Sequence, residues 1–174
     1  VRVHGEGVVH RVLPLGGGGA RVDALVAGGT AWLQAARAVG AVYGGFSAGC
    51  AIAPRRALVG GWRAEVGGRR VEVCAEEAGE DLDAVDVRDG LGLLPGAADV
   101  HAAQWGTLQR LLHAVVGGAA AVGWAVDEHT VLEVDGGAVR VHGEGVVHRV
   151  LPLDRGGARV DALVAGTTTT AEAP

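Results

Sequence analysis

One short segment contains residue types suited to nucleophilic catalysis. Ser47, the only serine among 174 residues, lies in the segment 45–49, "GFSAG", which has the form G-x-S-x-G. In this pattern a strand turns sharply into a helix and leaves the serine oxygen exposed on a strained corner. The backbone N–H of Ala48 can then help to stabilise an oxyanion. Because 31 residues are glycine, a plain strand-to-helix turn is the alternative interpretation.

A serine nucleophile needs a general base, which is usually a histidine. Of the seven histidines, His101 directly follows the apolar stretch "GLGLLPGAADV" and precedes a predicted helix. In an open α/β sheet, sites form at the carboxyl ends of strands. We therefore predict that His101 is the base. Cys50, three residues beyond Ser47, is a weaker alternative nucleophile.

The elements that must position these residues alternate between strands and helices. The segment 41–47, "AVYGGFS", is predicted to be a buried strand, and 48–54 a short helix that ends near a proline. Helical periodicity also marks 107–116, and a helix over 28–40 is expected after a Gly-Gly-Thr turn. The segment 121–134, "AVGWAVDEHTVLEV", predicts two further strands. The fold class is therefore α/β.

A near-identical duplication flanks this region. When residues 1–28 are aligned with residues 139–166, the two segments differ at two positions only. Gly16 and Gly17 of the first copy correspond to Asp154 and Arg155 of the second. Each copy alternates apolar and polar residues around turn sequences, which predicts short antiparallel strands. Two such hairpins would compete for one place on a sheet, so we expect the N-terminal copy to be held loosely.

The composition suits a single soluble domain. The net charge is −5, with 49% apolar and 20% charged residues. The sequence has no concentration of basic residues of the kind that would indicate a nucleic-acid partner. No apolar stretch reaches the roughly 18 residues of a membrane span, which predicts a cytoplasmic protein without a membrane partner. The two cysteines have neither disulfide-framework nor zinc-type spacing.

Three segments in order resemble the peptidase S51 family, the cyanophycinase and aspartyl-dipeptidase group. They are "GGFSAGCAIA", "GLGLLPGAADVHAAQWGTLQRLL" and "GWAVDEHTVLEV". The family pairs a G-x-S-A-G elbow with a D-x-H segment after a GLGL strand, followed by a G-x-x-x-DE-x-T strand. The resemblance covers the chain from about residue 28 to the C-terminal hairpins. It implies a three-layer α/β/α sandwich of the class I glutamine amidotransferase type, with C-terminal antiparallel strands.

The resemblance also implies an activity and several site residues. The activity is serine-type hydrolysis of a peptide or isopeptide bond, expected next to an aspartyl residue. Ser47 matches the family nucleophile, His101 matches its base, and Gly29 is expected to add an amide to that of Ala48 in the oxyanion hole. No metal or organic cofactor is implied, and a homo-oligomer is left open.

The carboxylate that completes the triad is a Glu or Asp between the serine and histidine segments in the family. Glu65 and Glu77 are equal candidates here, with Glu80 behind them. For each of the three, a solvated surface carboxylate is the alternative. Three further residues are candidates for the substrate side of the site: Gln104, Asp127 and Glu128. A structural role is an equal alternative for the last two.

Two departures from the family pattern affect these expectations. Ala102 stands where the family has an aromatic residue after its histidine. The family's first βα units, which precede the glycine turn, have no counterpart, so we expect a sheet that is incomplete at its N-terminal side. The expected organisation is a hairpin at 1–27, a hydrolase domain at 28–166 and a disordered tail at 167–174. The alternatives to an enzyme are a catalytically silent fragment and an amidotransferase-like binding module.

Overall fold

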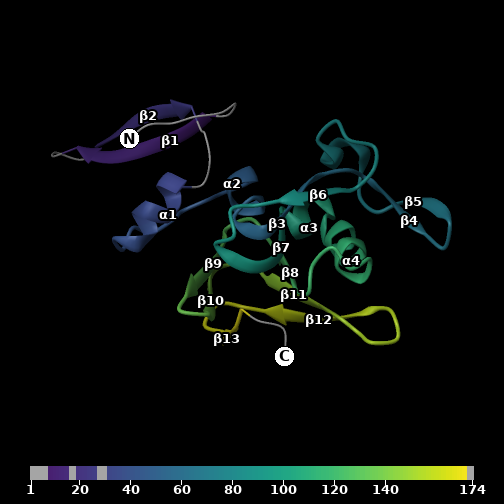
Figure 1. Ribbon diagram of the computed structural model, residues 1–174. Helices are drawn as coiled ribbons and strands as arrows, with labels where there is room; N and C mark the ends of the chain where they lie inside the picture. Colours follow the sequence, from purple (N-terminus) through teal and green to yellow (C-terminus); the bar gives the residue numbers. More distant parts are fainter. Residues whose placement is uncertain (1–7, 16–18, 27–30, 172–174) are drawn as a thin grey trace. The chain divides into compact units, whose positions relative to one another are not determined.

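The chain divides into two units in a computed structural model that describes residues 8–15, 19–26 and 31–171 (Figure 1). The first unit, Val1–Tyr43, contains strands β1 (Val8–Leu15) and β2 (Gly19–Val26) and helix α1 (Ala31–Ala38). The second unit, Gly44–Pro174, contains every other element. The division therefore falls between Tyr43 and Gly44, later than the boundary expected after residue 27.

The two copies of the duplicated sequence form the same hairpin. In the first copy β1 pairs with β2, and Val9 lies opposite Leu25. In the second copy β11 (Val147–Pro152) pairs with β12 (Ala158–Leu163), and Val147 lies opposite Leu163, which is the same register shifted by the repeat distance. The predicted antiparallel strands are confirmed for both copies.

A six-stranded sheet with the order β12-β11-β8-β7-β3-β6 forms the centre of the second unit. Besides β11 and β12, the sheet contains β3 (Pro54–Gly60), β6 (Asp86–Asp89), β7 (Leu94–Val100) and β8 (Gly123–Val126). The three central strands β3, β7 and β8 run parallel, whereas the outer strands pair antiparallel with their neighbours. This arrangement confirms a mixed α/β fold, and it places the carboxyl ends of β7 and β8 side by side.

The two faces of this sheet are covered by different layers. Helix α4 (Leu108–Val116), which confirms the helix predicted over 107–116, packs on one face against Ala97, Ala125 and Val150. A three-stranded sheet of β9 (Thr130–Asp135), β10 (Ala138–Gly143) and β13 (Thr168–Thr170) covers the other. Trp124, Val147 and Leu151 point toward that second layer, together with Val139 and Val141 of β10. Because side chains alternate between the faces of a strand, neighbouring residues join opposite cores.

The segment 41–46 is not the buried strand that its apolar sequence predicts. It is irregular, and Val42 and Phe46 are 94% and 89% exposed. The two edges of β7 pair with β3 and β8, so no strand leading into Ser47 lies beside the strand that ends at His101. The expectation of a strand leading into Ser47 is therefore wrong, although the short helix after it is present as α2 (Ala48–Ala51).

The predicted disordered tail is also wrong for residues 167–171. Strand β13 pairs antiparallel with β10, and the Ala171 side chain is buried in the core between the two sheets. Residues 172–174 lie outside the described part of the chain. Among the described residues, no helix is both long enough and apolar enough to cross a membrane.

A long excursion separates β3 from β6. It contains the hairpin β4 (Arg63–Val66) and β5 (Arg69–Glu72), which projects from the six-stranded sheet, and the 3₁₀ turn η1 (Glu76–Gly79) (Figure 1). A short helix, α3 (Ala102–Trp105), connects the end of β7 to α4. The buried Thr107 hydroxyl donates to the Val100 carbonyl at 2.7 Å, which fixes the end of β7 against the start of α4.

Candidate functional site

Ser47 lies on a strained corner at the start of α2. Its φ is 49° and its ψ is −125°, a combination that costs a non-glycine residue on the order of 1–3 kcal/mol. Such strain is a feature of the nucleophile elbow, where it exposes the hydroxyl oxygen. The Ser47 carbonyl accepts hydrogen bonds from the amides of Cys50 and Ala51, so the first turn of α2 holds the corner in place.

His101 follows β7 directly and also has a left-handed backbone, with φ at 56°. Its carbonyl accepts a hydrogen bond from the Trp105 amide at 2.8 Å, which begins α3 immediately after the histidine. The side chain of His101 is 20% exposed. The end of the strand thus presents the imidazole to a cleft of about 300 Å³ that Ser47, Ile52 and Trp105 also line.

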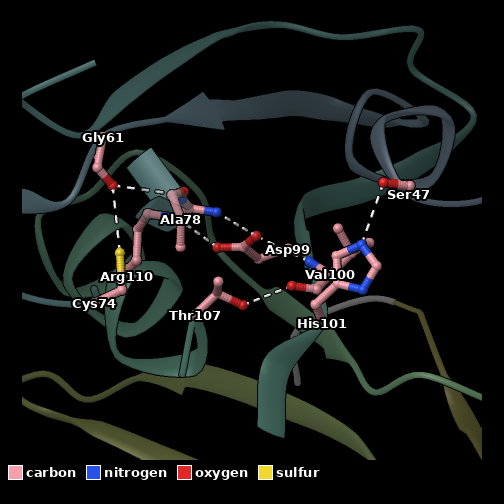
Figure 2. Close-up of polar contacts among 9 residues, drawn as sticks. All are labelled: Ser47, Gly61, Cys74, Ala78, Asp99, Val100, His101, Thr107 and Arg110. Atoms are coloured by element: carbon pink, nitrogen blue, oxygen red, sulfur yellow. Dashed lines mark hydrogen bonds and ion pairs between the residues drawn. The ribbon is translucent and has the colours of Figure 1, made fainter. Parts of the chain in front are cut away.

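Three side chains form a continuous hydrogen-bonded chain in this cleft. The Ser47 Oγ lies 3.2 Å from His101 Nε2 (Figure 2), and His101 Nδ1 lies 3.0 Å from Glu128 Oε1. An ionised carboxylate can only accept a hydrogen bond, so Nδ1 must carry the proton. Nε2 is then free to accept the hydroxyl proton of Ser47. This is the tautomer in which imidazole acts as a general base toward serine.

Glu128, rather than Glu65 or Glu77, contacts the imidazole. Glu65 is exposed on the β4–β5 hairpin, where it lies opposite Arg70. Glu77 is exposed on the 3₁₀ turn and lines a separate hollow. The structure therefore corrects the expectation that the acid lies between the serine and the histidine in sequence. Glu80, the third candidate, lines the same cleft as Ser47 but has no hydrogen bond to His101 among the described residues.

The position of Glu128 follows from the order of the strands. Val100 at the end of β7 pairs with Val126 at the end of β8. Residues that follow these two strands meet at the same edge, since neighbouring parallel strands end together. The signal was present in the sequence, because consecutive strands are neighbours more often than not.

Asp127 and Gln104, two of the predicted substrate-side residues, are engaged with the protein itself. The buried Asp127 carboxylate accepts hydrogen bonds from the amides of Ala103 and Val146. The side-chain carbonyl of Gln104 accepts one from the Glu128 amide at 3.1 Å. Both residues therefore help to fix the turn that carries Glu128, which is the structural role given above as the alternative for Asp127.

The second copy of the duplicated sequence supports the same turn. The Asp127 amide donates to the Val146 carbonyl, and the Glu144 amide donates to that of His129. Gly145 approaches so closely that a Cβ there would lie 2.5 Å from Thr130 Oγ1 and 2.8 Å from Asp127 Cβ. The "HGEG" loop of the second copy therefore requires a glycine beside the site.

A buried ion pair lies beneath the histidine. Arg110 of α4 donates from Nε and Nη2 to the two carboxylate oxygens of Asp99, at 2.9 and 2.8 Å. Its Nη1 also donates to the carbonyls of Gly61 and Ala78 (Figure 2). Burial raises the pKa of Asp99, while the hydrogen bonds and charge of Arg110 oppose that rise. The guanidinium thus connects β7, two residues before His101, to the excursion between β3 and β6.

Cys50 has none of the features of an activated nucleophile. Burial raises the pKa of its thiol, and the nearby charge of Asp99 raises it further. A cysteine nucleophile needs the thiolate, which this environment disfavours. The geometry therefore favours Ser47 over Cys50.

One amide is available to stabilise developing charge next to the nucleophile. The Ala48 N–H has no acceptor among the described residues, and it follows Ser47 directly in the chain. Gly29, the other predicted oxyanion-hole residue, lies outside the described residues.

In comparisons with known proteins, no family model and no curated protein matches this chain.

Proposed function

We propose that the chain is a serine-type hydrolase that cleaves a peptide or isopeptide bond. The observation that carries this proposal is the chain of contacts from Ser47 through His101 to Glu128. A strained serine, a base in the productive tautomer and a carboxylate that holds the base are the parts that acyl transfer by serine requires. The resemblance to the peptidase S51 family supports a bond next to an aspartyl residue.

The proposed reaction proceeds in the following steps. Ser47 Oγ forms a bond to the scissile carbonyl carbon while its proton moves to His101 Nε2, and the Ala48 amide hydrogen-bonds to the oxyanion. His101 then gives this proton to the leaving nitrogen as the C–N bond breaks. Water, deprotonated by the same imidazole, hydrolyses the acyl-enzyme and restores Ser47. Glu128 accepts the Nδ1 hydrogen bond throughout and stabilises the imidazolium.

The proposal includes a class I glutamine amidotransferase type of fold and a cytoplasmic location. The parallel strands β3, β7 and β8 with α4 on one face are compatible with one side of the class I glutamine amidotransferase fold. The three-stranded sheet covers the other face within the second unit, where that fold has helices. A cytoplasmic location is the expectation from composition.

A catalytically silent domain is the second candidate, and one observation favours it. No strand leads into the elbow, so Ser47 is anchored by α2 and His101 but not by sheet hydrogen bonds on its N-terminal side. A serine held from one side alone could sample positions outside the reach of His101.

Labelling with a fluorophosphonate distinguishes these two functions. Such a reagent phosphonylates an activated serine and leaves an ordinary serine unmodified. We expect a mass increase at Ser47 that is lost in Ser47→Ala and retained in Cys50→Ala. A chain that unfolds cooperatively on heating yet shows no modification of Ser47 contradicts the hydrolase proposal and favours the silent domain.

Substitution of Gly145 by alanine tests whether the second-copy loop positions the Glu128 turn. The new methyl group would collide with Thr130 and Asp127, so the turn must shift. We expect a loss of about 1–3 kcal/mol in unfolding free energy, the usual cost of overpacking, and slower labelling at Ser47.

Gly136→Ala is the matched control for this substitution. Unlike Gly145, Gly136 has a left-handed backbone, with φ at 55°, but it has open space around it and lies in the β9–β10 turn. We expect a loss of about 1–2 kcal/mol from backbone strain alone, with labelling unchanged. Equal labelling rates in the two variants would show that Gly145 does not position Glu128.

A further inference from the structure

Trp105 stacks on the imidazole of His101. The ring centroids are 4.3 Å apart and the planes differ by 23°. The contact follows from local structure, because the Trp105 amide donates to the His101 carbonyl and one turn of α3 brings the indole back over the histidine. The family's usual aromatic position, directly after the histidine, holds Ala102 in this chain, and Ala102 is buried in the core beneath α4.

We propose that Trp105 is a positioning residue for His101, an inference that rests on the proposed hydrolase function. The hydrogen bonds to Ser47 and Glu128 act at the two nitrogens, in the plane of the ring. They do not by themselves prevent the ring from swinging out of the cleft about its side-chain torsions. The indole covers one face of the imidazole and blocks that motion.

The same stacking bears on the proton transfer of the proposed reaction. His101 becomes an imidazolium when it accepts the proton of Ser47, and a cation is attracted to the face of an indole at this distance. The attraction is stronger after the proton transfer than before it. An interaction of this kind accelerates the chemical step rather than substrate binding.

If Trp105 formed only a wall of the substrate-binding cleft, its substitution would have a different effect on the kinetics. Trp105 is 45% exposed and lines the cleft with Ile52, so its removal could weaken binding of a substrate side chain. Such a loss would appear in KM for a peptide. It would leave the reaction of Ser47 with a small reagent such as diisopropyl fluorophosphate unchanged.

The test compares the second-order rate constants for diisopropyl fluorophosphate across three variants. We expect Trp105→Leu to react about 3- to 10-fold more slowly than the wild type, since it loses both the cation–π attraction and the fixed ring position. Trp105→Phe keeps an aromatic face and should recover most of the rate. The matched control Trp62→Leu removes an indole that lies against Arg63 instead, and should react at the wild-type rate.

A spectroscopic measurement separates this inference from the proposed function. The hydrogen bond to Glu128 deshields the proton on His101 Nδ1, so the wild type should show a downfield proton resonance that His101→Gln lacks. We expect this resonance to broaden or vanish in Trp105→Leu and to persist in Trp105→Phe. If the wild type is not labelled at Ser47, the hydrolase proposal fails, and the resonance alone then decides whether Trp105 holds the ring. A Trp105→Leu variant with an unchanged resonance and an unchanged rate overturns the inference.

Discussion

Glu128→Gln is expected to lower the rate of phosphonylation and of hydrolysis by roughly 10³- to 10⁴-fold, the loss typical when the acid of a serine triad becomes an amide. The glutamine amide can donate a hydrogen bond to His101 Nδ1, which moves the ring proton to Nε2. Nε2 then faces Ser47 with a proton and cannot accept another one. The substitution preserves size, and the Glu128 side chain is 39% exposed, so the fold should persist.

Two further substitutions make this a test of position rather than of charge. Glu65→Gln and Glu77→Gln each remove one negative charge from carboxylates that lie away from His101, and both should react at the wild-type rate. The rate constant for fluorophosphonate labelling measures all three variants under identical conditions. A large loss in Glu77→Gln with little loss in Glu128→Gln would contradict the arrangement of the site.

Local patterns in the sequence predicted much of the second unit correctly. The G-x-S-x-G segment places Ser47 at a positive φ, and the apolar stretch before His101 is the strand β7. Helical periodicity over 107–116 corresponds to α4, and the two strands expected in 121–134 are β8 and β9. Each of these features depends on residues close together in the chain, which is why the sequence reveals them.

Features that depend on distant partners were predicted wrongly. The segment 41–46 is apolar enough for a strand, yet both edges of β7 are taken and Val42 is left exposed. The threonine-rich tail has the composition of a disordered segment, but β10 offers a free edge to Thr168–Thr170. Glu128 became the partner of His101 because β8 lies beside β7, which periodicity alone cannot show. Pairing between strands, rather than propensity, decides all three cases.

Arg110→Met is expected to lower the unfolding free energy of the second unit by about 3–5 kcal/mol, the usual cost of removing one partner of a buried ion pair. The side chains of Arg110 and Asp99 are only 6% and 1% exposed. The substitution leaves the Asp99 carboxylate without a counter-ion, and the carbonyls of Gly61 and Ala78 lose their donor. Urea unfolding followed by tryptophan fluorescence, to which the buried Trp124 contributes, measures the loss.

Arg88→Met is the matched control, because Arg88 pairs with Asp86 on the surface, where the two side chains are 65% and 36% exposed. An exposed pair contributes about 0–1 kcal/mol, so this variant should unfold almost as the wild type does. Adding Asp99→Leu to Arg110→Met removes the unpaired charge and should recover part of the stability. A loss below about 1 kcal/mol in Arg110→Met, equal to that of the surface control, would contradict the role of this pair. The expected result would instead show that the stability of the second unit depends on the one guanidinium that joins the excursion between β3 and β6 to the strand that ends at His101.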